Sequence, residues 1–191
     1  MNETALSPRA ATTLEVLRGR RTVHDFLPER VDGALVERAI EAARWAPNHH
    51  RTEPWRFYLL GDLARSQLIA RNTQLVKDEK GERAAEVKRA RWEAVPGWLL
   101  ITCLRSEDQF REREDYAACC CAAQNMMLAL WAEGVGCKWT TGGITRDPEL
   151  FHLLGLHAAR EFVVGLFWYG RPVEVLEQQR RPLSQVLSRI E

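Results

Sequence analysis

Residues 116–132 constrain the fold of this chain more than any other segment. Their only strongly polar members are Gln124 and Asn125, so a helix over this segment would be apolar on every side. Such a helix must be covered all round, and one domain of 191 residues can scarcely do that alone. The sequence therefore indicates a partner subunit packed against this helix.

Length and charge bound the class of protein. A chain of 191 residues is about one domain's worth and shows no internal repeat, so we expect a single domain over residues 1–191. Lys and Arg number 27 against 26 Asp and Glu, which gives a formal net charge of +1. The surface as a whole cannot act as a polycation, and nucleic-acid binding would have to rest on a local patch.

The sequence carries no signal for membrane insertion or export. The longest unbroken apolar run covers residues 116–123, well short of the ~20 that a helix needs to cross a bilayer. The first residues do not combine a basic start with an apolar stretch, as a secretion signal would. Five cysteines, three of them contiguous at 119–121, suit buried thiols in a reducing compartment. We therefore expect a cytoplasmic protein that does not span a membrane.

Capping residues and apolar spacing predict helices. Residues 13–18 form a short amphipathic segment that ends at Gly19. Asp32 can cap a second helix, whose apolar residues recur at three- and four-residue spacings. An Asp-Pro pair at 147–148 predicts the start of a further helix that ends at Gly155.

Other segments predict strands, a charged excursion and an arm. Residues 55–61, 97–104 and 161–169 are aromatic or apolar and predict strands, the last two of them buried. Residues 62–95 are dense in interspersed charges at helical spacing, which predicts a solvated helical excursion. Residues 178–191 lie beyond the last compact element and predict an extended arm.

Missing motifs exclude several kinds of site. The chain has no CxxC or HExxH, and His152 and His157 are five residues apart rather than four, so no metal site is expected. GxSxG and SxxK are absent, and so are GxGxxG and the Walker motif. We therefore predict no nucleophile, no catalytic acid or base, and no Rossmann or P-loop nucleotide site.

Two basic pairs are the first candidates for ligand binding. Arg20, Arg21 and Thr22 place two fixed cations and a hydroxyl at the end of a short helix, where they can contact a phosphate. Arg180 and Arg181 form a second pair. Taken alone, arginines of this kind are more often simply solvated.

Aromatic residues are the second group of candidates. Trp45 and Trp55 flank one loop, and residues 139–142 form a Trp-Thr-Thr-Gly turn, both of which would suit a flat ligand. A tryptophan is more often part of the core than a stacking platform. The order of these features along the chain therefore matters more than any one of them.

That order resembles the flavin-dependent nitroreductase family. RRTVHDF followed by VDGALVERAIEAARWAPNHHRTEPWRFYLL is similar to the family's opening Arg-x-Ser-x-x-x-Phe stretch, helix, Ala-Pro-Ser-x-x-Asn-x-Gln-Pro-Trp motif and strand. GVGCKWTTGG resembles the Trp-x-(Ser/Thr)-Gly segment of the smaller YdjA-like branch. EFVVGLFWYGRP resembles the penultimate strand and its Gly-x-Pro exit. The resemblance covers most of the chain and is weakest in the charged excursion.

The resemblance implies an α+β fold with a central, mostly antiparallel sheet flanked by helices. It also implies an intertwined homodimer with FMN at the interface between the chains. The apolar helix would then be buried against its counterpart. The C-terminal arm, residues 178–191, would be exchanged and add a strand to the partner's sheet, in an obligate interface.

The resemblance also implies roles for individual residues. Side chains near the start of the chain would hold the phosphate and ribityl chain, Arg180 or Arg181 would approach the phosphate, and His49 would reach the flavin from the other subunit. Trp139, Thr140 and Thr141 would close the site. The cofactor-binding residues that this implies are Arg20, Arg21, Thr22, Trp45, Pro47, Asn48, His49, Arg51, Trp139, Thr140, Thr141, Gly142 and Arg180.

Three positions depart from the family pattern. Arg51 and Glu53 stand where Asn and Gln usually precede Pro-Trp, and Thr140 replaces an arginine often found after the tryptophan. The two charged side chains either reshape the pocket or pair with each other.

The resemblance implies electron transfer from NADH or NADPH through FMN to a small, electron-poor acceptor such as a nitroaromatic or a quinone. A flavin supplies this chemistry itself, which agrees with the absence of catalytic motifs. Three alternatives stay open: a relative with other reduced-flavin chemistry, such as dehalogenation or flavin breakdown, an FMN-binding dimer without turnover, and a nucleic-acid-binding module.

Overall fold

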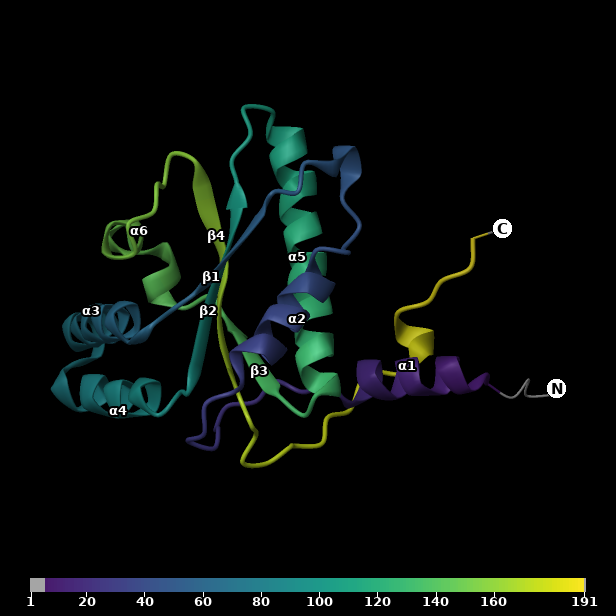
Figure 1. Cartoon of the computed structure of the whole chain (residues 1–191), viewed down its shortest axis with the longest axis horizontal. Helices are drawn as coiled ribbons and strands as arrows, with labels where there is room; N and C mark the ends of the chain where they lie inside the picture. The colour runs from purple at the N-terminus through teal and green to yellow at the C-terminus, as the bar shows by residue number, and fades with distance from the viewer. Residues whose placement is uncertain (1–5, 191) are drawn as a thin grey trace.

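A four-stranded antiparallel sheet forms the centre of the molecule (Figure 1). The computed structural model describes residues 6–190. The strand order is β1-β2-β4-β3, and each neighbouring pair is antiparallel. The strands are β1 (Trp55–Leu59), β2 (Gly97–Leu104), β3 (Gly136–Thr140) and β4 (Glu161–Gly170). The expected α+β fold with a mostly antiparallel sheet is confirmed.

Helices cover both faces of the sheet, which explains the apolar runs of the central strands. In β2 only the last residue, Leu104, is less than fully buried. In β4 the buried residues include Leu166, Phe167 and Trp168. Because neighbouring residues in a strand point to opposite faces, a continuous apolar run is stable only where both faces are packed.

One face of the sheet packs against α5 (Gln109–Ala132) and α2 (Gly33–Ala43). The α2 helix starts at its predicted cap, where the Asp32 carboxylate accepts the N–H of Ala34 at 3.0 Å. The α5 helix contains the whole apolar segment and begins earlier, because Asp108 caps it by accepting the N–H of Phe110. Within residues 6–190, no helix combines the length and apolarity that crossing a membrane requires.

The other face packs against α3 (Asp62–Lys80), α4 (Glu82–Glu93) and the short α6 (Glu149–Leu153). The expectation of one solvated excursion over residues 62–95 is therefore wrong in part. Gly81, at φ 86°, divides it into two helices. Their inner sides bury Leu68 and Trp92, and Trp92 packs edge-on against Trp98 with ring centroids 5.2 Å apart. Most of the charges lie on the outer side and conceal this amphipathic pattern.

An ion pair fixes α3 to the turn before α6. The Arg71 guanidinium donates to the nearly buried Asp147 carboxylate, with 2.6 Å between Nε and Oδ2. The same carboxylate accepts the N–H of Glu149 at 3.1 Å, as its predicted capping role requires. The hydrogen bond from Arg71 holds the pKa of Asp147 below its ordinary value. The carboxylate is therefore charged at neutral pH and keeps both partners.

The helix α1 and the C-terminal segment both extend from the body on the α5 side of the sheet (Figure 1). The first helix, α1 (Pro8–Gly19), starts earlier than expected because Ser7 caps it and Pro8 occupies its first turn. Every residue of α1 is at least partly exposed. Residues 173–190 are exposed throughout, and apart from one short 3₁₀ turn (Leu183–Gln185) they are irregular. The expected pairing of this arm with a partner stays a prediction.

The absence of a side chain at Gly165 is required by close packing between β4 and β3. A Cβ at this position would overlap the indole of Trp139. We therefore expect Gly165→Ala to lower the free energy of unfolding by about 1–3 kcal/mol, measured from urea unfolding curves. Gly33→Ala is the control, because a Cβ there meets no atom within 4 Å. Equal unfolding midpoints for the two variants would contradict the packing described.

Candidate functional site

A strongly basic cavity lies between the end of α1, α5 and the C-terminal segment. Its volume is about 560 Å³. The lining contains arginine and glutamine side chains and no carboxylate, so like charges face one another across an open space. Such an arrangement favours a ligand with at least two negative charges. The lining residues are Leu17, Arg18, Arg20, Arg21, Gln124, Gln178 and Arg180.

The C-terminus of α1 positions the first arginines of this cavity. Arg20 is the C-cap, and its N–H donates to the Val16 carbonyl at 3.1 Å. The Arg21 guanidinium donates to the carbonyls of Gly19 and Arg20 at 3.1 and 3.0 Å, and its Nε donates to Leu176 at 3.2 Å. Arg21 therefore caps the helix and ties it to the C-terminal segment. It is a structural residue as well as part of the cavity wall.

Three guanidinium groups are left for a ligand. Those of Arg18, Arg20 and Arg180 form no hydrogen bond or ion pair with any part of the chain that the structure describes. Thr22 lies in a smaller adjoining cavity of about 210 Å³, which shares Arg21 and Gln178 with the first. The structure thus places Arg180, and not Arg181, with the N-terminal arginines.

Sequence reasoning missed four of the lining residues, namely Leu17, Arg18, Gln124 and Gln178. A signal existed for Gln124, because it is one of two strongly polar residues in an otherwise apolar segment. No comparable signal marks Gln178, which reaches the cavity only because the C-terminal segment folds back past α1.

The loop between α2 and β1 holds the second set of predicted residues. Trp45 is 81% exposed, and Pro47 is exposed as well. Three residues of this loop have left-handed backbone angles, His50 at φ 62°, Arg51 at 52° and Glu53 at 45°. Such angles cost free energy for residues other than glycine and are retained where the surroundings enforce them.

Polar contacts with α5 enforce this loop conformation. The Asn48 side-chain oxygen accepts the N–H of Glu53 at 2.7 Å. The Thr52 hydroxyl donates to the buried Asp115 carboxylate on α5. Beside it, Nδ1 of His49 lies 3.0 Å from a carboxylate oxygen of Glu114. The loop is therefore fixed to the N-terminal third of α5.

The end of β3 supplies the third predicted set. The Trp139 indole packs against Phe167, with ring centroids 5.1 Å apart, and donates to the Val164 carbonyl at 3.2 Å. Trp139 is therefore half-buried and packs against the core cluster. Thr141 and Gly142 are exposed in the turn that follows. The half-buried Thr140 ends the strand.

Two buried cysteines near these elements, Cys119 and Cys137, have raised pKa values. All five cysteines of the chain are free thiols. Burial raises the pKa of Cys137 to about 12, and a hydrogen bond with Cys103, together with burial, raises the pKa of Cys119. Neither of these two thiols therefore forms a thiolate at neutral pH.

Within one chain, the basic cavity and the loop lie at different places along α5. The loop contacts Glu114 and the cavity contacts Gln124, ten positions later, which corresponds to about 15 Å along the helix axis. The predicted site residues are therefore not all brought together by a single copy of the chain.

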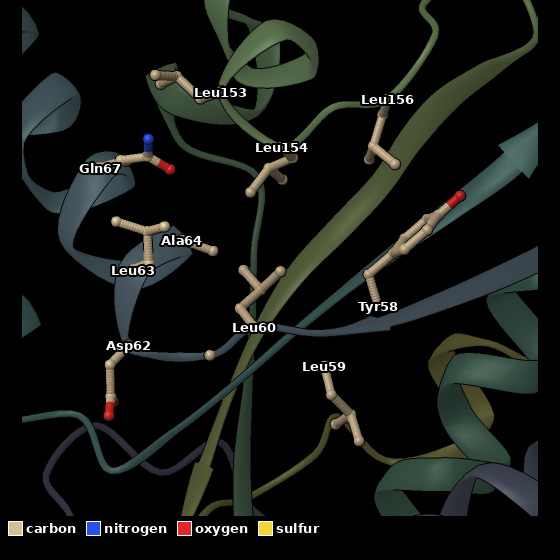
Figure 2. A pocket seen from close by; sticks show the side chains of 11 residues that line it. Tyr58, Leu59, Leu60, Asp62, Leu63, Ala64, Gln67, Leu153, Leu154 and Leu156 are labelled. Atoms are coloured by element: carbon tan, nitrogen blue, oxygen red, sulfur yellow. The ribbon is translucent and has the colours of Figure 1, made fainter.

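An apolar cavity occupies the opposite side of the sheet. It has a volume of about 470 Å³ and lies between β1, the start of α3 and α6 (Figure 2). Leucines dominate its wall, and the Tyr58 hydroxyl at one end donates to Glu161 at 2.9 Å. None of the predicted site residues lines it. The cavity is separate from the candidate site.

Most of the chain matches one known protein family. The model of the nitroreductase family matches residues 17–171, which include the first arginine pair, the loop and β4. The chain belongs to the nitroreductase family. The resemblance seen in the sequence is confirmed, and the match ends before Arg180.

Two bacterial relatives match nearly the whole length of this nitroreductase-family chain. The first is provisionally named NAD(P)H nitroreductase YfhC, from Bacillus subtilis strain 168, and is 31% identical over 87% of this chain and 88% of its own. The second is provisionally named NAD(P)H nitroreductase YdjA, from Escherichia coli strain K12, and is 25% identical over 83% and 87%.

Solved structures of family members have the same fold. A nitroreductase-like family protein from Bacillus cereus superposes with a TM-score of 0.85 at 27% identity, covering 100% of both chains. A nitroreductase-type protein from Desulfovibrio desulfuricans, solved in complex with FMN, superposes with a TM-score of 0.77 at 26% identity, covering 98% of this chain and 99% of its own.

We expect Thr52→Val to loosen the loop, because the buried Asp115 carboxylate would lose a hydroxyl donor. The free energy of unfolding should fall by about 1–3 kcal/mol, and amide hydrogen exchange over residues 48–53 should accelerate. Thr12→Val is the matched control, since the Thr12 hydroxyl donates only to a carbonyl of the exposed α1. If both variants keep the wild-type exchange rates, the Thr52 hydroxyl does not hold the loop.

Proposed function

We propose that this chain is an FMN-dependent oxidoreductase that passes electrons from NAD(P)H to small, electron-poor acceptors such as nitroaromatics or quinones. The observation that carries the proposal is the basic cavity, where Arg20, Arg21 and Arg180 meet as the family resemblance implies. The relative from D. desulfuricans, which binds FMN, supports the cofactor. The provisional names of YfhC and YdjA support the nicotinamide.

The side chains of the cavity suit the phosphate end of FMN. A phosphate monoester carries close to two negative charges at neutral pH and accepts several hydrogen bonds. The unpaired guanidinium groups of Arg20 and Arg180 can donate to it, and the amides of Gln124 and Gln178 can donate to neighbouring oxygens. Arg21 would act mainly by keeping the helix end and the C-terminal segment in place.

We further propose that the working unit is a homodimer. The chain's own elements cover only one side of α5, and Tyr116 on that helix is 40% exposed. The C-terminal arm exposes Val186 and Ile190, at 70% and 96%. Apolar surface of this kind marks an interaction site. In a two-fold dimer with the α5 helices antiparallel, the loop of one copy would lie beside the basic cavity of the other.

This arrangement gives the residues of the loop a role in the partner's site. Nδ1 of His49 faces Glu114, which leaves Nε2 for a ligand held by the other chain. Trp45 presents a broad apolar surface beside it. The exposed Arg51 and Glu53 adjoin the same place and would help to select the acceptor. Bound FMN supplies the hydride and electron transfer, so the chain needs to position the ring rather than provide an acid or base.

An absorbance spectrum tests the function directly. We expect the purified protein to be yellow, to lose its flavin absorbance when NAD(P)H is added without oxygen, and to recover it when a nitroaromatic or quinone is added. Light scattering should give twice the 21.9 kDa of one chain. A colourless protein that takes up no added FMN would overturn the proposal.

Other outcomes of the same experiment identify the alternatives. A yellow protein that oxidises no NAD(P)H with any acceptor would be a non-enzymatic FMN-binding dimer. Reduction followed by loss of halide from a halogenated substrate, or by breakdown of the flavin, would identify a different reduced-flavin reaction. Product analysis separates these last two.

We expect Arg20→Ala to weaken FMN binding about tenfold to a hundredfold, or roughly 1.5–3 kcal/mol, because a charged donor to the phosphate is lost. Fluorescence titration of apoprotein with FMN measures the change. Arg83→Ala, on the outer side of α4 across the sheet, is the matched control and should bind FMN like the wild type. Equal affinities for the two variants would remove Arg20 from the phosphate site.

A further inference from the structure

Two consecutive histidines and one glutamate form a cluster outside the basic cavity. One ring nitrogen of His49, one of His50 and one carboxylate oxygen of Glu114 all lie within 4.8 Å of one another. We propose that these three side chains bind a divalent transition-metal ion such as Zn²⁺. The proposal does not depend on FMN binding or on the proposed electron transfer.

The backbone at His50 brings the two imidazoles together. Consecutive side chains diverge by about 100° on a helix and point to opposite faces of a strand, so neighbouring histidines seldom share a ligand. At His50, φ of 62° and ψ of 3° turn the chain into the left-handed region. The His49 and His50 rings stack, with centroids 3.9 Å apart and planes 21° apart. Spacing rules for metal ligands look for separated residues, so they do not detect this pairing of neighbours.

The third side chain comes from α5 and faces the pair. Both carboxylate oxygens of Glu114 lie 3.0 Å from Nδ1 of His49. The next residue on the helix, Asp115, accepts the hydrogen bond from Thr52 that fixes the loop. The loop that carries the histidines and the helix that carries the glutamate are therefore joined directly beside the cluster. This support holds the ligands close together before an ion arrives.

The donor set selects the class of ion. Two imidazoles and one carboxylate form the ligand set of zinc sites that keep a fourth position for water. Imidazole nitrogens favour Zn²⁺, Cu²⁺, Ni²⁺ and Co²⁺ over Mg²⁺ and Ca²⁺, which take oxygen ligands. Bonds of about 2.0–2.1 Å in a tetrahedral site place ligand atoms about 3.3 Å apart. The ligand atoms now lie within 4.8 Å of one another, and small rotations of the exposed His49 and His50 rings can bring them to the shorter spacing.

Calorimetric titration of the untagged protein, as purified, with ZnCl₂ tests the site. We expect one ion per chain with micromolar affinity. His50→Ala and Glu114→Gln should each weaken binding at least about tenfold. Co²⁺ should give visible bands at wavelengths beyond the flavin absorption, without the thiolate charge-transfer band that a cysteine ligand would produce. His49 is left unchanged because it is also expected to contact the flavin.

Two control variants exclude other ligands. His157→Ala removes an exposed histidine far from the cluster in sequence, and Cys121→Ser removes the exposed thiol. Both should bind Zn²⁺ like the wild type. The proposal is overturned if the wild type binds no Zn²⁺ at micromolar concentration, if His50→Ala binds as tightly as the wild type, or if Cys121→Ser abolishes binding. Thermal unfolding and flavin content of each variant show whether a loss of binding reflects a loss of fold.

Discussion

The packing of α5 against the sheet and α2 is the interaction on which the rest of the structure depends. Its buried side, which includes Cys119, Ala123 and Met126, forms the centre of the larger hydrophobic core. Small side chains at several of these positions allow the helix to approach the sheet closely. The same helix carries Glu114 and Asp115, which hold the loop, and Gln124, which lines the basic cavity. Every candidate functional element is therefore positioned relative to α5.

Two local features run against stability and are typical of functional sites. Four arginines face one cavity that no carboxylate lines, so their mutual repulsion is relieved only by solvent or by an anion. The loop before β1 holds three residues other than glycine in the left-handed region. A sequence selected only for stability would avoid both, and both lie where the nitroreductase-family motifs fall.

The proposed dimer would cover the apolar surfaces that one copy exposes and would complete the candidate site. A single chain exposes the outer side of α5, the whole of α1 and an arm with several large apolar residues. It also separates the loop from the basic cavity along α5. A two-fold arrangement would cover these exposed surfaces. It would also bring the loop of one copy beside the basic cavity of the other, because the same antiparallel contact between the α5 helices does both.

Three of the four strands, the cap of α2 and three of the four arginines of the cavity can be predicted from the sequence alone, whereas β3 and Arg18 were not. Apolar runs such as residues 97–104 and local hydrogen bonds such as that of Asp32 depend on neighbours close in the chain, so their patterns can be read directly. Only the tertiary structure showed that residues 62–93 form a packed pair of helices, that Arg21 caps α1, and that His49 and His50 share one side of a turn. These depend on contacts between distant segments and on one unusual backbone angle, and neither leaves a periodic trace in the sequence.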